Sequence, residues 1–425
     1  MKMDNLLEQM LSAENLNNAY LQVKRNKGAA GIDEMKVNEL SEHMKANGEL
    51  FKEQIRKRKY KPLPVRRVEI PKADGGIRNL GVPTVTDRLI QQAIAQVLVP
   101  IYEQQFNDKS YGFRPGRCAE MAIIRSLEMM NDGYTWVVDI DLEKFFDKVN
   151  HDKLMNLVSR TIKDGDVISL IRKFLVSGVM IDDEYKETTI GTPQGGNLSP
   201  LLSNIMLNEL DKELEERGLN FVRYADDCII LTKSEKSANR VMKSVTNYLQ
   251  EKLGLKVNTA KSKVDRPNGI KFLGFGYYFD TFCYQFKAKP HANSVEKLKK
   301  KLNKLTSKNW GVSTAYRMMK LKQLIVGWVN YFKIGRMKDL CRRLDAHIRF
   351  RLRMCIWKQW KKVKTRYRNL MKLGIPKGKA WEWANTRKGY ARVARSFILH
   401  RAITNDRLKK FGLISLLDRY QLVHI

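Results

Sequence analysis

Two adjacent acids between apolar runs constrain this chain more than any other feature. Asp226 and Asp227 follow the run 221–224 and precede the run 228–231. This pattern predicts a β-hairpin with carboxylates at its tip. Because successive side chains of a strand point to opposite faces, at least one of the two aspartates must project toward whatever lies across the site.

A second predicted strand also ends in acids, because the apolar run that starts at Trp136 leads into Asp139 and Asp141. Hard divalent cations such as Mg²⁺ are held by one or two carboxylates plus substrate phosphates. A pair of such ions can steady both the attacking and the leaving oxygen of a phosphoryl displacement. Taken alone, however, two acids after an aromatic residue are more often a solvated turn than a metal site.

Further segments accompany the acids in a defined order. They are Ile70-Pro71-Lys72, Arg78-Asn79-Leu80-Gly81-Val82-Pro83, Ser110-Tyr111-Gly112-Phe113-Arg114-Pro115, the Asp139 strand with Phe145-Phe146-Asp147, residues 192–200, Tyr224-Ala225-Asp226-Asp227, residues 253–258 with Lys261 and Lys263, and Phe272-Leu273-Gly274-Phe275. This order resembles the successive motifs of reverse transcriptases. The residues in these segments are similar to those of group II intron-encoded reverse transcriptases and maturases, and the resemblance extends over nearly the whole chain.

The resemblance implies an α+β fold: a right-hand polymerase with fingers and palm, followed by an all-helical thumb and a small basic C-terminal domain. The expected divisions are an N-terminal extension of the fingers (1–65), fingers and palm (66–288), a helical thumb or maturase domain (289–365) and a basic DNA-binding region (366–425). Apolar spacing independently predicts helices over 86–106, 118–131, 152–162 and 200–217. Pro200 and Gly218 mark the ends of the last one.

For catalysis the resemblance implies Asp139, Asp226 and Asp227. Two Mg²⁺ ions, or Mn²⁺ as a substitute, are expected on Asp139 and Asp226 and on the backbone carbonyl of Ile140. Asp227 is expected to act beside the metals. Alternation lets Asp141 share the face of Asp139, but the resemblance gives it no ligand role, and we expect Asp141, Glu143 and Asp147 to be structural.

A hairpin is predicted around Asp74-Gly75-Gly76, with Lys72 and Arg78 on an arm that can fold over the active site. A triphosphate needs such cations to offset developing charge, although in isolation both would be ordinary surface charges. The resemblance places the incoming nucleotide against Lys72, Arg78, Phe145, Gln194 and Lys261. A bulky ring at Phe145 would exclude a 2′-hydroxyl, and the adjacent Phe146 would then be the core aromatic.

Template and primer contacts are implied for Arg114, Gly195, Gly196, Trp328 and Tyr331. The two glycines permit a close backbone approach that residues with a Cβ do not, although they could merely break the chain before the next helix. The aromatic stripe with Trp328 and Tyr331 resembles a thumb helix that packs along a duplex. A stripe of core side chains is the alternative that the sequence leaves open.

The charge distribution agrees with a nucleic-acid partner. The formal net charge is +34, and residues 291–425 hold 35 Lys and Arg against 6 Asp and Glu. Such a region is the electrostatic footprint of a nucleic-acid binder. With no apolar run of about 18 residues and no secretory signal, we expect no membrane partner. Five cysteines without a Cys-x-x-Cys pair indicate a reducing compartment, so we expect a cytoplasmic bacterial protein that could associate with the nucleoid.

The expected function is RNA-directed synthesis of DNA from dNTPs on an RNA template with a DNA primer. The resemblance adds binding of a group II intron RNA for splicing and of target DNA for mobility. One alternative is a reverse transcriptase of another bacterial retroelement, such as a retron or a diversity-generating element. The other is a non-catalytic RNA-binding splicing factor, which the presence of Asp139 and Asp226 disfavours. Family members often end in an endonuclease domain with paired cysteines and histidines, and we expect a bacterial type without one.

Overall fold

The acidic strands pair in one four-stranded sheet, ordered β6-β7-β3-β8. Its strands are β3 (Trp136–Ile140), β6 (Asn220–Tyr224), β7 (Asp227–Thr232) and β8 (Lys263–Asp265). β3 lies between β7 and β8 and is antiparallel to both. The sheet therefore joins the two acidic segments that the sequence places far apart.

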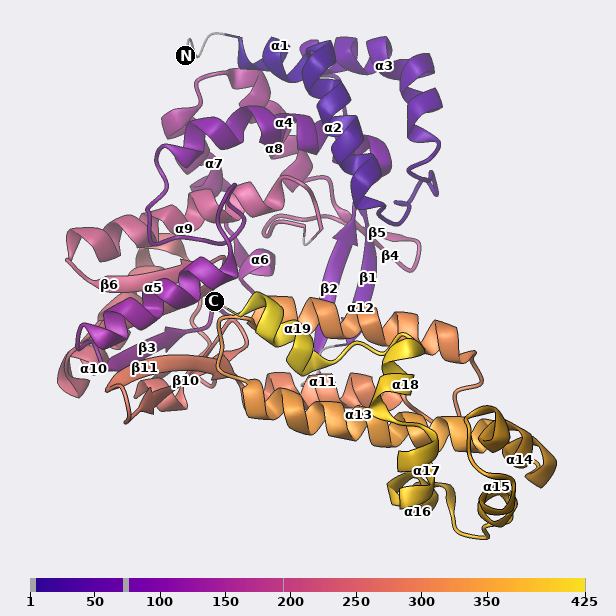
Figure 1. The fold of residues 1–425 in the computed structure, drawn as a ribbon. Coiled ribbons are helices and arrows are strands. Elements are labelled where there is room, and N and C mark those ends of the chain that lie inside the picture. Colours follow the sequence, from indigo (N-terminus) through magenta and orange to yellow (C-terminus); the bar gives the residue numbers. More distant parts are fainter. Residues whose placement is uncertain (1–4, 72–75, 194, 425) are drawn as a thin grey trace. The chain divides into compact units, whose positions relative to one another are not determined.

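The computed structural model describes residues 5–71, 76–193 and 195–424. The chain separates into two compact units, Met1–Arg266 and Pro267–Ile425 (Figure 1). The acidic sheet belongs to the first unit. None of the divisions expected at residues 65, 288 and 365 coincides with the boundary between these units. Lys72 and Gln194 lie outside the described residues.

Helices build most of the first unit. They are α1 (Leu6–Leu11), α2 (Ala13–Asn26), α3 (Leu40–Arg56), α4 (Val85–Glu103), α5 (Ala119–Asn131), α6 (Phe145–Lys148), α7 (His151–Thr161), α8 (Gly165–Leu175), α9 (Ser199–Glu216) and α10 (Glu235–Tyr248), which continues as a π-helical turn, Leu249–Leu253. The helices predicted from apolar spacing are confirmed as α4, α5, α7 and α9, with ends within three residues of those expected. Pro200 lies in the first turn of α9, and Gly218 follows its end with φ of 63°.

Apolar side chains from one face of the acidic sheet join these helices in a common core. Val138, Ile140 and Ile230 belong to that core together with the apolar residues of α9 and α10. Asp139 and its partner Ile229 alternate with them and lie outside the cluster. Because neighbouring side chains on a strand alternate, the core determines on which face the carboxylates can lie.

A second sheet, ordered β2-β1-β4-β5, contains the predicted basic hairpin. Its strands are β1 (Val65–Pro71), β2 (Ile77–Val82), β4 (Val179–Ile181) and β5 (Glu184–Lys186). β1 and β2 pair antiparallel from the Arg66–Val82 pair to the Pro71–Ile77 pair, which confirms the two predicted strands. The turn that joins them falls in residues 72–75, outside the described residues.

The second unit begins with a small sheet and continues as helices. After a 3-10 turn, Pro267–Gly269, the strands β9 (Lys271–Phe272), β10 (Phe275–Asp280) and β11 (Gln285–Pro290) form an antiparallel sheet. The helices are α11 (Ala292–Leu305), α12 (Thr314–Phe332), α13 (Lys338–Gln359), α14 (Val363–Lys372), α15 (Lys377–Ala384), α16 (Tyr390–Arg395), α17 (Phe397–Ala402), α18 (Asn405–Lys410) and α19 (Leu416–Val423). The predicted helical character of the last third is confirmed. Nowhere in the described chain is a helix long and apolar enough to cross a membrane.

The final helix completes the core of the second unit. α19 packs on α12 and α13, and its Leu416 and Tyr420 are buried. The buried Asp345 of α13 accepts hydrogen bonds from Ser415 Oγ at 2.7 Å and from the N–H groups of Leu416 and Leu417 at 2.8 and 3.1 Å. The stretch expected as a separate basic region therefore shares a core with the expected thumb.

This anchoring predicts a stability effect. Asp345→Ala should lower the free energy of unfolding by about 1–3 kcal/mol, because buried donors at the start of α19 lose their acceptor. Urea denaturation followed by circular dichroism measures the loss. Asp339→Ala is the control, because this carboxylate lies on the same helix in an exposed pair with Arg342 and should contribute less than about 1 kcal/mol. Equal losses in both variants would contradict the anchoring.

Candidate active site

The turn between β6 and β7 holds two of the predicted acids. Tyr224 pairs with Asp227, so Ala225 and Asp226 are the two turn residues. Ala225 has φ of 56°, in the left-handed region that tight two-residue hairpins require and that glycine adopts most readily. Asp226 is partly buried, and Asp227 is exposed. The predicted acidic hairpin is confirmed.

The strand register bears on the choice between two acids, Asp139 on β3 and Asp141 just after its end. Asp139 pairs with Ile229, two pairs away from Asp227 on β7, and with Lys263, the first residue of β8. Extending the β3–β7 register by one pair beyond Ile140 brings Asp141 level with Asp227. Since a strand rises about 3.3 Å per residue, Asp139 lies roughly 7 Å farther from the turn than Asp141 does. Of these two acids, Asp141, which we expected to be structural, lies nearer to Asp226 along the sheet.

Backbone hydrogen bonds hold Asp141 in this place. Its N–H donates to Ser262 Oγ at 3.0 Å, and its carbonyl accepts from the Asn258 N–H at 2.8 Å. Both partners belong to the loop that precedes β8. The loop thus fixes the main chain of Asp141 just beyond the end of β3.

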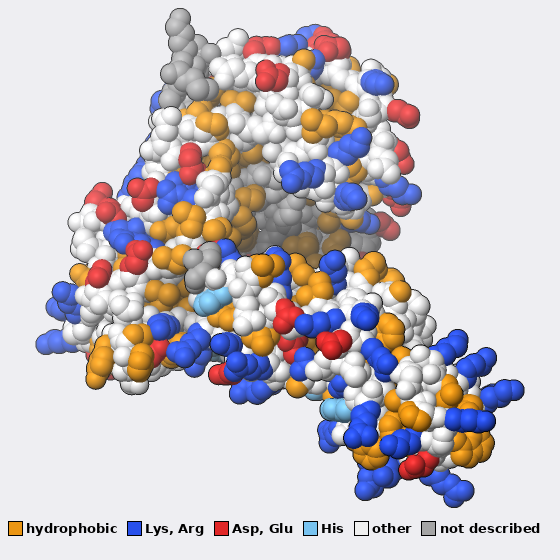
Figure 2. Space-filling model, viewed as in Figure 1, with side chains coloured by type: hydrophobic (Ala, Val, Ile, Leu, Met, Phe, Trp, Pro, Cys, Tyr) orange, Lys and Arg blue, Asp and Glu red, His pale blue; other side chains and the backbone are white. Residues whose placement is uncertain are grey.

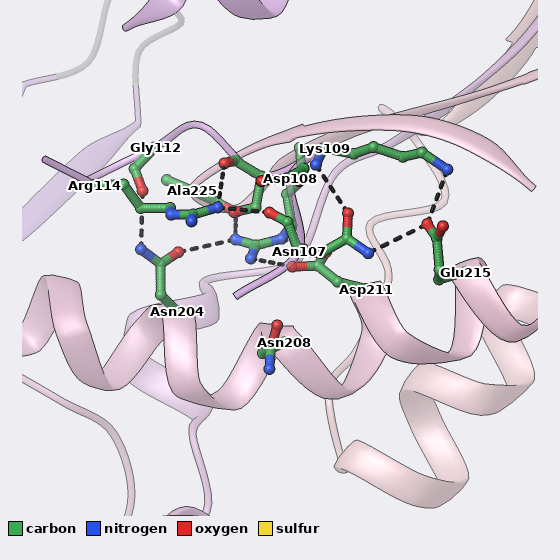
Figure 3. Close-up of polar contacts among 12 residues, drawn as sticks. Asn107, Asp108, Lys109, Gly112, Arg114, Asn204, Asn208, Asp211, Glu215 and Ala225 are labelled. Carbon is green, nitrogen blue, oxygen red and sulfur yellow. Dashed lines mark hydrogen bonds and ion pairs between the residues drawn. The ribbon is translucent and has the colours of Figure 1, made fainter. Parts of the chain in front are cut away.

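A buried ion pair supports the turn (Figure 3). The side chains of Arg223 on β6 and Asp211 on α9 are 1% and 0% exposed. Arg223 binds both carboxylate oxygens, with Nε to Oδ1 at 2.7 Å and Nη2 to Oδ2. Its Nη1 donates to the carbonyl of Ala225 at 2.9 Å and to Asn204 Oδ1 at 3.0 Å. A buried charge is tolerated in such a bidentate, fully hydrogen-bonded arrangement.

The loop before α5 packs against the same turn. The Tyr111 N–H donates to the Arg223 carbonyl at 2.8 Å, and Asn204 Nδ2 donates to the Gly112 carbonyl at 2.9 Å. A Cβ on Gly112 would lie 2.2 Å from the Ala225 nitrogen. A side chain at this position would therefore displace the turn that carries the acids.

Arg114 holds this loop and does not meet the expected template-binding role. Its side chain is 3% exposed and pairs with Glu103 at 2.6 Å. Its Nη1 also donates to the carbonyls of Asn107 and Ser110. The expectation of a template contact is therefore corrected, because a buried guanidinium with these partners is not presented to a nucleic acid.

Comparisons with known proteins identify the family. A model described as reverse transcriptase (RNA-dependent DNA polymerase) matches residues 70–277, and the group II intron maturase-specific domain matches residues 295–374. Protein YkfC of Escherichia coli (strain K12) is 33% identical over 59% of this chain and 76% of its own length. The chain belongs to the group II intron reverse transcriptase/maturase family. The family predicted from the motifs is confirmed, and the maturase match disfavours the retron and diversity-generating alternatives.

Two further likenesses are weaker in coverage or in fold similarity. The group II intron-encoded protein LtrA of Lactococcus lactis subsp. cremoris is 38% identical over 55% of this chain. The chain covers only 38% of the length of LtrA. Among solved structures, a chain of a partial Cas6-RT-Cas1–Cas2 complex aligns with 58% of this chain and over 43% of its own length. The TM-score is 0.37, and the sequence identity is 24%.

In this reverse transcriptase the two adjacent phenylalanines differ in burial. Phe145 begins α6, is 2% exposed and belongs to the hydrophobic core. The ring of Phe146 is only partly buried and meets the Phe145 ring edge-on, with centroids 5.2 Å apart. Phe145 is therefore a core aromatic, and Phe146 packs against the same core with part of its ring exposed. Contact of either ring with a bound sugar stays a prediction.

The two glycines expected under the template lie close to β2 and α4 of the same chain. Gly195 has φ of 129°, and a Cβ on it would lie 2.6 Å from the Gly81 carbonyl. A Cβ on Gly196 would lie 2.7 Å from Gln91 Oε1. The predicted close approach is confirmed, and the partners are β2 and α4. Contact of either glycine with a template stays a prediction.

The other expected nucleotide contacts lie at accessible positions. Arg78 is exposed on β2, and Lys261 is exposed in the loop before β8. Ile140 is buried, and its backbone lies within the β3–β7 ladder. The structure thus leaves the two cations within reach of a ligand, and their binding roles stay predictions.

The aromatic stripe on α12 packs within the second unit of the reverse transcriptase. The Phe332 ring lies 4.8 Å from the rings of both Trp328 and Phe275. Tyr331 is 46% exposed, and its hydroxyl donates to the Leu273 carbonyl at 2.9 Å. Phe332 therefore has the core role that the sequence left open, whereas Trp328 is partly buried and Tyr331 is exposed. Contact of Trp328 and Tyr331 with a nucleic acid stays a prediction.

The acids at the turn suit a hard divalent cation. The candidate ligands Asp141, Asp226 and Asp227 offer carboxylate oxygens, whereas burial raises the pKa of the adjacent Cys228 thiol and keeps it protonated. No cage of three or more metal-binding side chains is present in the part of the chain that the structure describes. Mg²⁺ seldom needs one, because it retains water and takes substrate phosphates alongside one or two carboxylates.

The buried pair yields a second stability prediction. Asp211→Asn should lower the free energy of unfolding by about 3–5 kcal/mol, because Arg223 would keep a buried charge without its partner. Chemical denaturation measures this loss, and primer extension should fall with it as the turn loosens. Glu213→Gln removes a partly exposed carboxylate of α9 that pairs with Arg217 at the end of this helix, and it should cost no more than about 1 kcal/mol. If both variants were equally stable, the pair would not support the turn.

Proposed function

We propose that this protein is an RNA-directed DNA polymerase whose catalytic acids are Asp141, Asp226 and Asp227, and that it also binds an intron RNA to assist splicing. One observation carries the catalytic part: the strand register brings Asp141 level with Asp227, beside the two-residue turn that holds Asp226. The family assignment supports the activity, and the geometry supports this choice of acids over one that includes Asp139.

The divalent ions of such a site, Mg²⁺ or Mn²⁺ as a substitute, would orient the attacking and leaving oxygens and neutralise charge on the transferred phosphate. Asp141 and Asp226 are the proposed ligands, and Asp227 is the neighbouring acid. The resemblance implied a backbone carbonyl ligand at the residue after the first acid. With Asp141 as that acid, this residue would be Leu142 in place of Ile140.

The chain's other residues position the nucleotide in this proposal. Arg78 on β2, together with Lys72 on the same hairpin, would bind the triphosphate, as a transferring phosphoryl group requires fixed cations. Phe146 would lie under the sugar and select dNTPs. Lys261 would face the leaving pyrophosphate, and Gln194 would contact the base pair being formed.

The polymer partners proposed are the group II intron RNA, an RNA template with a DNA primer, and target DNA. The excess of positive charge over residues 291–425 supports them, since 35 Lys and Arg stand there against 6 Asp and Glu. The match to the maturase-specific domain over residues 295–374 supports the intron RNA in particular. The cytoplasm is the proposed compartment.

The choice between the two acids of β3 can be tested directly. Asp141→Asn should reduce primer extension at least about 100-fold, because a metal ligand contributes several kcal/mol to the transition state. Asp139 lies two residues earlier on the same strand face, so Asp139→Asn should reduce primer extension less than about tenfold. Single-nucleotide extension on an RNA template with saturating dNTP measures both. A greater loss for Asp139→Asn, with both variants folded, would restore the original assignment.

The sugar assignment makes a separate prediction. Phe146→Ala should raise incorporation of ribonucleotides relative to deoxynucleotides, because the bulk beside the 2′ position is removed. Competition between rNTP and dNTP in primer extension measures the ratio. Phe145→Leu is the matched control, because it changes the core ring while limiting the cavity that Phe145→Ala would leave. Relaxed sugar choice in Phe145→Leu with none in Phe146→Ala would reverse the assignment.

A further inference from the structure

A basic pocket lies in the second unit, where one face of α13 meets the helices α16 to α18. Its volume is about 370 Å³, and its lining residues are Ala346, Arg349, Phe350, Arg353, Arg395, His400 and Asn405. The α13 residues recur at the spacing that brings side chains to one helix face. The lining holds three arginines and no Asp or Glu. The pocket is thus built for an anion.

Arg353 is fixed in the wall of this pocket. The residue is 4% exposed, and its Nε donates to the Ile403 carbonyl at 2.9 Å while its Nη2 donates to Asn405 Oδ1 at 3.0 Å. Neither partner carries a charge. Burial and then the neighbouring Arg349 lower the pKa of Arg353. A bound anion would compensate for both effects.

The opposite wall presents a second guanidinium in a defined orientation. The Arg395 guanidinium stacks over the Phe350 ring at 4.7 Å from its centroid. Stacking orders the planar group and leaves its N–H edge for hydrogen bonds. Burial, followed by the charge of Arg353, lowers the pKa of His400, which favours the neutral imidazole with one donor and one acceptor nitrogen.

We propose that this pocket binds a backbone phosphate of a nucleic-acid strand, with Arg349 and Arg395 as the ligands. The proposal rests on the proposed function only for the presence of a nucleic-acid partner. Guanidinium forks match phosphate oxygens in geometry and charge. The volume exceeds what a lone ion needs and falls within the range of small-ligand sites, which leaves room for an attached sugar.

The surroundings favour a strand over a free nucleotide. Residues 338–410 hold 23 Lys and Arg against 4 Asp and Glu. Figure 2 shows Lys and Arg side chains gathered over the region of α14 to α17. Charge that continues past the pocket can neutralise successive phosphates of one polymer. RNA and DNA share the phosphodiester chemistry, so the experiment includes both.

The experiment measures binding of the full chain to a labelled DNA duplex and to a labelled RNA stem-loop, across a salt series and with EDTA present. Arg349→Gln and Arg395→Gln should each weaken binding roughly tenfold, as expected for a lost charge-assisted hydrogen bond, and lower the salt slope by about one. Because both arginines face one phosphate, the double variant should lose little more slope than either single variant. A loss with one polymer alone would support the pocket and identify the strand that it holds.

Arg392→Gln is the matched control, because Arg392 is exposed on α16 and does not line the pocket. Its effect should be smaller and should add to that of Arg349→Gln. Equal and additive losses for all three arginines would overturn the proposal in favour of a diffuse basic surface.

Arg395→Lys keeps the charge and removes the planar fork, so it should fold normally and weaken binding with little change in salt slope. Full affinity in this variant would also overturn the pocket. EDTA removes divalent ions, so the binding assay does not depend on DNA synthesis. A wild-type protein that binds nucleic acid but fails to extend primers when Mg²⁺ is supplied would refute the proposed polymerase function and leave the pocket proposal standing.

Discussion

The ion pair between Arg223 and Asp211 is the interaction on which the arrangement of the acids depends. An isolated charge at that depth would be strongly destabilising, so the pair holds only because each hydrogen-bonding group of the guanidinium has a defined acceptor. One of those acceptors is the carbonyl of Ala225, a residue with a Cβ in a left-handed conformation that costs roughly 1–2 kcal/mol. The core thus stabilises the strained turn at which Asp226 lies.

Sequence patterns predicted the features that depend on local chemistry. The hairpin at Asp226, the ends of α9 between Pro200 and Gly218, and the basic helical last third all follow from residue spacing and turn residues. They could be predicted because each is decided within a short window of the chain. The paired strands β1 and β2 belong to the same class.

Local patterns could not decide the placement of residues that depends on distant parts of the chain. Asp139 and Asp141 share a strand face, so alternation could not separate them, and only the pairing of β3 with β7 shows which is level with the turn. Phe145 and Phe146 are adjacent, and the packing of α6 decides which is buried. Arg114 carried no local signal of its pairing with a carboxylate on another element.

The close contact at Gly112 has a consequence for how related sequences can diverge. The backbone of this glycine touches the turn at Ala225, and Asn204 links it to the same guanidinium that Asp211 neutralises. Three stretches of chain, separated by about a hundred residues at the widest, are thereby joined in one network. A substitution at one of these positions should disturb the network unless the contacting positions change as well. Across homologues these positions should therefore covary or stay fixed together, even though none of the supporting side chains belongs to the proposed catalytic acids.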